Sequence, residues 1–295
     1  MIVVFGSINL DLTARVPHLP RAGETLLGSA FSTCAGGKGA NQALAARRAG
    51  SMVALHGAVG RDAFADASLA LLRHDGVDID GVRVLDAPTG VALIHVDSEG
   101  QNTITVVPGA NGLVEGAWVP ASTLGPTSIV LMQLETPHAE VLALATRARA
   151  AGARVILNAA PARRLAPELL AQVDVLVVNE SEAAVLGSSR SPEVFATEFV
   201  ARFGAAIVVT LGASGLLAAS RDTQARLPAP QVAVVDTVGA GDALVGALAA
   251  ALDRGAPWPR ALREGLAAGS LACTRRGAQT SLPWRDEIAA LADTI

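Results

Sequence analysis

The chain has 295 residues, of which 51% are hydrophobic and 17% are charged, and its formal net charge is −4. This composition supports a large hydrophobic core and excludes an intrinsically disordered protein. The weakly acidic balance offers no basic surface for nucleic acid, and no apolar run of the sequence is long enough to cross a bilayer.

The N-terminal residues and the cysteines indicate a cellular compartment. Residues 1–5 are apolar but lead directly into Gly6 and polar residues, which is not the pattern of a signal peptide. The two cysteines, Cys34 and Cys273, have neither metal-ligand nor CxxC spacing, which is typical of free structural thiols in a reducing compartment. We therefore expect a cytoplasmic protein that binds neither nucleic acid nor membrane.

Strand-like and helix-like segments alternate along most of the chain. Apolar runs predict strands at residues 2–5, 53–56, 128–134, 154–157, 173–178, 206–210 and 216–219, and a strand end at 234–235. Helix patterns occupy residues 39–49, 62–74, 137–151, 180–186, 192–203 and most of the tail from 241. Asp62 is placed as an N-cap, and Pro257 and Pro283 as first helical residues. Continuous apolar strands separated by helices predict an α/β fold: a mostly parallel sheet covered by helices on both faces.

Two segments interrupt this alternation. Residues 12–33 are rich in Pro and Gly, and residues 89–108 alternate around a hairpin turn at Asp97-Ser98-Glu99-Gly100. Both predict antiparallel strands, and such a small sheet needs a cover for its apolar face. We expect a β lid of residues 11–33 and 88–108, and a body of residues 1–10, 34–87 and 109–295. We also expect a homodimer that pairs through the lid.

The segment Asp236-Thr237-Val238-Gly239-Ala240-Gly241-Asp242 has the pattern of an anion site beside a base. Its small residues allow a tight turn with several N–H groups on one side, and the following helix adds the positive end of its dipole. Asp242 is then placed to take a proton from a hydroxyl while the anion site stabilises a phosphoryl group. Taken alone, the motif is more often an ordinary helix cap.

Two clusters near the N-terminus suit a polar ligand at the carboxyl edge of the sheet. Asn9 and Asp11 fit the vicinal hydroxyls of a sugar, although an Asx turn is the better explanation of this segment taken alone. The loop Gly36-Gly37-Lys38-Gly39-Ala40-Asn41-Gln42 lacks the hydroxyl residue of a P-loop. It can nevertheless bring Lys38 and Asn41 to one ligand, or form a tight turn with a solvated lysine.

Three later strand ends carry similar alternatives. Glu135 can accept from a sugar hydroxyl or simply end a strand. The amide of Asn179 and the carboxylates of Glu180 and Glu182 can hold Mg²⁺ through water, although an Asn cap with acidic residues that complement the helix dipole is a strong alternative. The turn from Thr210 through Gly212 can contact a nucleotide or form a plain hairpin. The joint placement of these clusters at one sheet edge favours a ligand site.

Together these motifs resemble the ribokinase-like (phosphofructokinase-B) carbohydrate kinases, from about residue 3 to residue 284. The signature segments are residues 36–42 and 236–242, and further similar stretches are 132–135, 158–163, 179–182 and 274–279. The resemblance implies ATP-dependent phosphorylation of the 5-hydroxyl of D-ribose, with Mg²⁺ and a K⁺ activator. A kinase for 2-deoxyribose or a nucleoside, and a sugar-binding regulator without catalysis, remain alternatives.

The resemblance also implies a role for each matching residue. Asp242 would be the base, Ala240 and Gly241 with the N–H of Asp242 would form the anion hole, and Gly239 would belong to the same catalytic turn. The sugar would contact Asn9, Asp11, Gly37, Lys38, Asn41, Glu135 and Asp242. ATP would contact Asn179, Thr210, Gly212 and Gly241, with Glu182 near Mg²⁺ and an apolar Leu266 near the adenine. K⁺ would bind at Asp236, Val238, Ala272, Arg275, Gly277 and Ser281.

Overall fold

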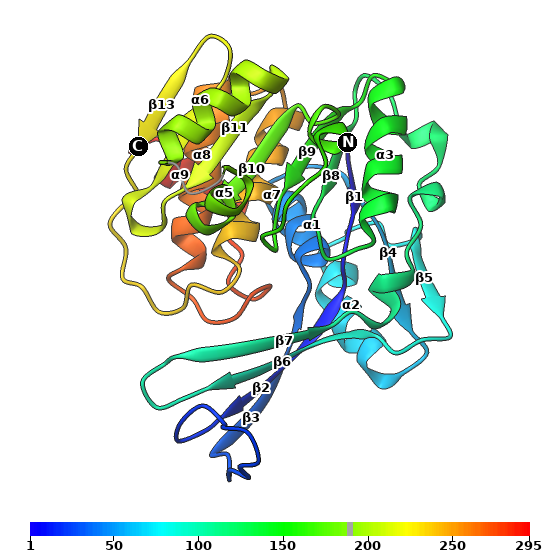
Figure 1. Ribbon diagram of the computed structural model, residues 1–295, viewed down its shortest axis with the longest axis vertical. Coiled ribbons are helices and arrows are strands. Elements are labelled where there is room, and N and C mark those ends of the chain that lie inside the picture. Colours follow the sequence, from blue (N-terminus) through cyan, green and yellow to red (C-terminus); the bar gives the residue numbers. More distant parts are fainter. Residues whose placement is uncertain (188–190) are drawn as a thin grey trace.

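The body is built on a nine-stranded sheet (Figure 1). The structure is a computed structural model and describes residues 1–187 and 191–295. The strand order is β13-β12-β11-β10-β9-β8-β1-β4-β5. The bounds are β1 Ile2–Phe5, β4 Val53–Gly60, β5 Val82–Leu85, β8 Ile129–Met132, β9 Arg154–Asn158, β10 Val175–Asn179, β11 Ala206–Thr210, β12 Leu216–Ala219 and β13 Gln224–Leu227. Every pair from β11 to β5 is parallel, and β12 and β13 add antiparallel at one edge. The predicted mostly parallel sheet is confirmed.

Helices cover both faces of this sheet, as the alternating burial of β1 shows. Ile2 and Val4 belong to one hydrophobic cluster, which includes residues of α1, α2, α7, α8 and α9. Val3 and Phe5 belong to a second cluster, which includes residues of α3, α4, α5 and α6. The bounds are α1 Lys38–Arg48, α2 Ala63–His74, α3 His138–Ala150, α4 Pro167–Leu170, α5 Glu180–Gly187, α6 Pro192–Phe203, α7 Ala240–Asp253, α8 Trp258–Ala272 and α9 Arg285–Ala292. In the described ranges, no helix has the length and apolar character needed to span a membrane.

Helix starts agree with the sequence where a side chain supplies the cap. Asp62 caps α2 by accepting from Phe64 N and Ala65 N. The two proline starts were placed too early. Pro257 is the N-cap of α8 rather than its first residue, and α9 begins only after Trp284, whose N–H donates to Glu287 at 2.9 Å. The side chain of Glu287, three residues later, satisfies that N–H as in a capping box, a local signal that proline position alone does not encode.

The predicted strand end at Val234 and Val235 is wrong. This segment is irregular, and Val235 N donates to Cys273 O, just beyond the end of α8, at 2.8 Å. Both valines are exposed. The backbone finds its partner at a helix end instead of in the sheet, so the apolar run has no strand to pair with.

The lid is a four-stranded sheet that projects from the body toward the lower left of Figure 1. Its order is β3-β2-β6-β7, with β2 Asn9–Arg15, β3 Ala30–Gly36, β6 Gly90–Val96 and β7 Asn102–Val107. The predicted hairpin turn is present, since Asp97 N donates to Gln101 O at 3.0 Å. The two outer pairs are antiparallel as predicted, whereas the central pair β2–β6 runs parallel. Both central strands leave the body side by side, which fixes their common direction.

Candidate active site

The separate motifs of the sequence meet at the carboxyl edge of the parallel strands. The residues at or just after the ends of β1, β8, β10 and β11 are Gly6, Gln133, Asn179 and Thr210. The helices α1 and α7 start with Lys38 and Ala240. Hydrogen bonds between α1 and the first turn of α7 bring the two signature segments together. This is the edge at which α/β sheets bind their ligands.

Asp242 lies in the first turn of α7, and two side chains of α1 hold its carboxylate. Asn41 Nδ2 donates to Oδ2 at 2.9 Å, and Gln42 Nε2 donates to Oδ1 at 2.8 Å. Only 8% of Asp242 is exposed. Because each donor occupies one lone pair, each carboxylate oxygen retains acceptor capacity for a ligand.

Further amide side chains behind Asp242 form a network for which no role was predicted from the sequence. Gln42 Nε2 also donates to Asn158 Oδ1 at 2.9 Å, and Gln42 Oε1 accepts from Gln133 Nε2 at 2.7 Å. Gln133 and Asn158 lie in stretches that resemble the carbohydrate kinases, and this resemblance was the only sequence signal that could have indicated the network. The role of the network follows from the contacts among α1, β9 and the end of β8. The network fixes the Gln42 amide, which in turn orients the Asp242 carboxylate.

The turn before α7 leaves two N–H groups free beside this carboxylate. Gly239 has a φ of 77°, in the left-handed region that favours glycine, and it is the N-cap of the helix. Ala240 N donates to Thr237 O at 3.3 Å. Within the described ranges, the N–H groups of Gly241 and Asp242 have no acceptor. These two groups and the positive end of the helix dipole form an anion site.

Lys38 lies close to four carboxylates. Burial alone would lower the pKa of its ammonium group, but the charges of Asp242, Glu135, Glu182 and Asp11 outweigh burial and raise the pKa. Lys38 is therefore protonated and neutralises part of an acidic site.

For Asp11, burial and the neighbouring carboxylates shift the pKa in the same direction. Burial first, and then the charges of Glu135 and Asp242, raise the pKa of Asp11 to about 6, although Lys38 opposes this shift. Asn9 lies two residues earlier and shares the face of β2 with Asp11, because side chains alternate along a strand. Two of the predicted sugar contacts therefore face the same acidic site.

Glu135 is fixed by contacts from Ser7, which follows β1, and from Lys38 in the first signature loop. Ser7 Oγ donates to Glu135 Oε2 at 2.6 Å, and Lys38 N donates to the same oxygen at 3.2 Å. Ser7 Oγ in turn accepts from Gly39 N at 3.3 Å. A Cβ at Gly39 would lie 2.5 Å from Ser7 N, so this close approach requires glycine. The sequence did not point to Ser7.

Two adjoining cavities lie at this edge of the sheet, and Asp242 lines the polar one. The polar cavity, of about 140 Å³, is lined by Lys38, Asn158, Glu182 and Asp242 among others. The apolar cavity, of about 300 Å³, is lined by Gly212, Pro230, Val232 and Leu266 among others. Thr210 and Gly241 line both. A ligand with a flat apolar end and an anionic end therefore fits across the junction, with its anion beside the free N–H groups.

Asn179 and Glu182 form a reciprocal cap at the start of α5. Glu182 N donates to Asn179 Oδ1 at 2.8 Å, and Asn179 N donates to Glu182 Oε2 at 2.8 Å. Burial first, and then the charge of Asp242, raise the pKa of Glu182, opposed by the Asn179 N–H and by Lys38. Both residues also line the polar cavity, so the cap and the predicted ligand contact are compatible.

Comparison with known proteins agrees with this geometry. The pfkB family of carbohydrate kinases matches residues 1–285. The chain belongs to this family. It is 37% identical to the ribokinase of Bacillus subtilis over 97% of both chains, and 34% identical to that of Haemophilus influenzae over 97% of this chain and 96% of the relative.

Solved structures of ribokinases have the same fold as this chain. Thermotoga maritima ribokinase superposes with a TM-score of 0.92 at 32% identity, covering 99% of each chain. An Arabidopsis thaliana ribokinase complexed with ribose and ATP has a TM-score of 0.89 at 32% identity, covering 99% of this chain and 98% of that one. The ribokinase-like fold predicted from the sequence is thus confirmed.

The loop around Asp236 lies behind the anion site of the kinase. Asp236 Oδ1 accepts from Val238 N at 3.1 Å, and Oδ2 accepts from Gly277 N at 2.9 Å. In the described part of the chain, the carbonyl oxygens of Val238, Arg275 and Gly277 accept no hydrogen bond. A carboxylate close to unpaired carbonyls is a donor set that suits a weakly hydrated cation. By contrast, Ala272 O accepts from Arg275 N at 3.2 Å.

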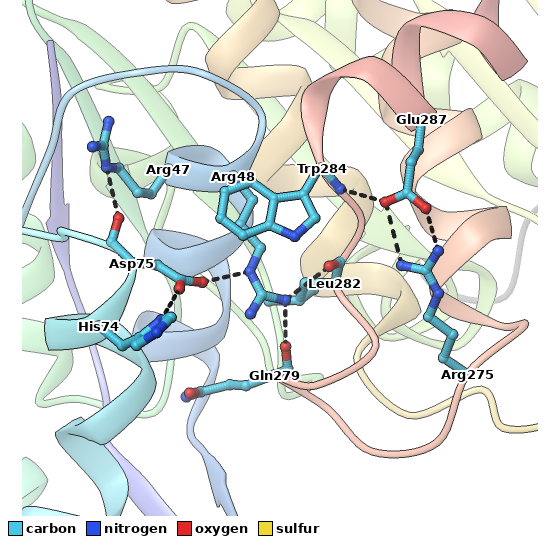
Figure 2. A network of polar contacts seen from close by, with 9 residues as sticks. All are labelled: Arg47, Arg48, His74, Asp75, Arg275, Gln279, Leu282, Trp284 and Glu287. Carbon is cyan, nitrogen blue, oxygen red and sulfur yellow. Dashed lines mark hydrogen bonds and ion pairs between the residues drawn. The ribbon is translucent and has the colours of Figure 1, made fainter.

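Arg48 ties the segment behind the anion site to two helices (Figure 2). Its Nη1 donates to Gln279 O at 2.9 Å and to Leu282 O at 2.8 Å, and its Nε donates to Asp75 Oδ2 at 2.7 Å. A Cβ at Gly239 would lie 2.9 Å from Ala278 O, so this segment packs directly against the turn before α7. The Arg48 network (Arg48, Asp75 and the two carbonyls) therefore supports the backbone of the anion site.

The raised pKa of Asp11 gives the kinase a predicted pH dependence. Asp11 is ionised above about pH 6 and protonated below it, and the ionised form accepts hydrogen bonds more strongly. We expect kcat/KM for the carbohydrate to fall as the pH drops through about 6, by about tenfold per pH unit at the limit. Asp11→Asn should remove this titration. An unchanged midpoint in Asp11→Asn would assign it to another group.

Proposed function

We propose that the chain transfers the terminal phosphoryl group of ATP to the 5-hydroxyl of D-ribose, giving ribose 5-phosphate and ADP. The observation that carries this proposal is the oriented Asp242 carboxylate, which lies beside the free N–H groups of Gly241 and Asp242 where two cavities meet. The names of the curated relatives and the ribose and ATP of the Arabidopsis thaliana complex support the choice of substrates.

In this mechanism, Asp242 accepts the proton of the attacking hydroxyl. Asn41 and Gln42 hold the carboxylate, so no reorganisation is needed when the hydroxyl arrives. The N–H groups of Gly241 and Asp242 stabilise the negative charge on the transferring group. Asn9, Asp11, Gly37, Lys38 and Glu135 orient the sugar. Phosphoryl transfer depends mainly on such positioning and charge neutralisation.

The nucleotide is proposed to bind across both cavities. Its base fits the apolar cavity against Leu266, which is the apolar contact expected from the sequence. Thr210, Gly212 and Gly241 line the path from this cavity toward Asp242, and Asn179 lines the polar cavity. In this orientation of the nucleotide, its phosphates lie over the free N–H groups of Gly241 and Asp242.

Two cations are proposed to assist the reaction. Glu182 would hold Mg²⁺ through water, since Mg²⁺ keeps much of its hydration shell and the described residues contain no cluster of three acidic, His or Cys ligands. Mg²⁺ would neutralise phosphate charge. K⁺ would bind Asp236 with Val238, Arg275 and Gly277, and with the buried Ser281, and would keep the turn before α7 in shape. Ala272 is the weakest of the proposed ligands, because its carbonyl is already bonded.

A kinase for 2-deoxyribose is the second candidate. The chain is 33% identical to the deoxyribokinase of Salmonella typhi over 96% of its length, which is close to its identity with the ribokinases. Overall identity therefore does not separate the two sugars, and the residues that face the sugar have to do so.

A substrate panel tests the proposed function. ADP release is measured with D-ribose, 2-deoxy-D-ribose, other pentoses, hexoses and nucleosides, in KCl and in NaCl. We expect the highest kcat/KM for D-ribose and a faster rate in KCl. A higher kcat/KM for another substrate would overturn the assignment of D-ribose, and equal rates in the two salts would exclude the K⁺ site.

A homodimer through the lid, in the cytoplasm where ATP is available, completes the proposal. The lid exposes apolar side chains on both faces, Phe31 and Leu93 on one and Ile104 and Val106 on the other, and a second copy would cover one of these pairs. Sedimentation equilibrium tests this pairing: a wild type that remains monomeric at micromolar concentration would contradict it.

A further inference from the structure

Asn111 is a buried amide outside the site described above, and the backbone sets its orientation. It lies one turn after the lid, and only 1% of it is exposed. Its Oδ1 accepts from Ile8 N at 2.9 Å, and its Nδ2 donates to Ile8 O at 3.0 Å. Exchanging the oxygen and nitrogen would place donor against donor and acceptor against acceptor, so only one orientation satisfies both contacts.

The orientation of Asn111 determines that of Asn9. Asn111 Nδ2 also donates to Asn9 Oδ1, at 2.7 Å. The carbonyl oxygen of Asn9 therefore faces Asn111, and its NH₂ group is the free end. Within the described ranges, Asn9 Nδ2 makes no hydrogen bond, although the residue is only 3% exposed. Nδ2 itself is not fully buried, so it is a donor that a ligand in the site can reach.

The free NH₂ group belongs to the face of β2 that meets the substrate. Asn9 and Asp11 share that face, and the pKa of Asp11 responds to the charges of Lys38 and Asp242. Gly90 leaves the space for the contact between the two amides. A Cβ at Gly90 would lie 2.2 Å from Asn111 Nδ2 and 2.3 Å from Asn9 Oδ1.

We propose that Asn111 is a positioning residue that makes Asn9 a hydrogen-bond donor toward the carbohydrate and thereby selects a sugar with an acceptor oxygen at that point. The inference rests on the proposed function, because it assumes a carbohydrate beside Asn9. A site built to bond a hydroxyl strongly disfavours the analogue that lacks it. Asn111, which does not itself contact the substrate, would thus contribute to discrimination between a sugar and its deoxy analogue.

The variant Asn111→Asp tests this relay. Its carboxylate still accepts from Ile8 N but cannot donate to Asn9 Oδ1, so the Asn9 amide turns and presents oxygen to the sugar. We expect the KM and the calorimetric dissociation constant for D-ribose to rise about tenfold, with the KM for ATP within about twofold. Asn102→Asp makes the same chemical change on the exposed start of β7 and should leave all three constants unchanged.

A double-mutant cycle separates the relay from a structural effect. In an Asn9→Ala background, Asn111→Asp should change the D-ribose constants by less than about twofold, because the group through which it acts is gone. A tenfold rise in that background, or no rise in the wild-type background, overturns the proposal.

Gly90→Ala provides a second test should Asn111→Asp fold poorly. It inserts a methyl group between the two amides while leaving both of them, and it should show the same dependence on Asn9. An effect that persists without Asn9 overturns the proposal here as well. A wild type that binds D-ribose without phosphorylating it contradicts the proposed function alone, and the cycle is then measured from the dissociation constants.

Discussion

Asp242→Asn is expected to lower kcat by about 10²- to 10⁴-fold, the usual contribution of a positioned general base. An amide cannot take the proton of the hydroxyl, whereas the carboxylate can. The site accommodates the change without losing its structure. Asn41 Oδ1 is buried and has no partner in the part of the chain that the structure describes, so the Asn41 amide can turn and accept from the new NH₂ group.

Steady-state kinetics and calorimetry together measure this effect. We expect the dissociation constant for D-ribose to stay within about tenfold of the wild-type value, because the other sugar contacts remain. Asp222→Asn, the same change on an exposed turn, is the matched control and should leave kcat unchanged. A kcat for Asp242→Asn within threefold of the wild-type rate would exclude Asp242 as the base.

Arg48→Met is expected to lower the free energy of unfolding by about 3–5 kcal/mol, the usual cost of breaking a buried ion pair. The side chains of Arg48 and Asp75 are 9% and 2% exposed, so the substitution leaves a carboxylate inside the protein without its guanidinium. It also leaves Gln279 O and Leu282 O without their donor (Figure 2).

Urea denaturation measures this loss, and Arg47→Met is the matched control on the preceding residue. Among the described residues, the Arg47 side chain donates only to the backbone carbonyls of Asp75 and Ser51, at 3.0 and 3.4 Å, so its replacement should cost about 1 kcal/mol. Equal losses for the two variants would show that the Asp75 carboxylate contributes little. We also expect a lower kcat for Arg48→Met, because the carbonyls that Arg48 holds follow directly after Ala278, which packs against Gly239.

Parts of this protein that depend on local chemistry were predictable from its sequence. Apolar runs marked the strands, and Asp62 marked a helix start, because a cap forms within one turn of chain. The anion site followed from small residues before a helix. What failed was Val234-Val235, where a strand pattern met no neighbouring strand. Local pattern does not report which partners the rest of the chain provides.

The amide networks were beyond sequence reasoning for a different reason. Gln42 contacts Asn158 and Asp242, which are 116 and 200 positions away in the chain, and Asn111 contacts Asn9 across 102 positions. An amide side chain can donate or accept, so its role is decided only by the partners that the fold brings to it. Charged residues at strand ends are visible in a sequence, whereas the neutral residues that orient them are not.

The parallel pairing of β2 with β6 makes the lid a single unit encoded in two separate stretches of the chain. Each hairpin contributes one central strand, and without the other hairpin it would be a two-stranded ribbon, which is only marginally stable in water. Neither stretch can therefore be gained, lost or exchanged alone during evolution without exposing the other. Grafting the lid of a relative onto this kinase requires both stretches, together with the residues at the points where they leave the body.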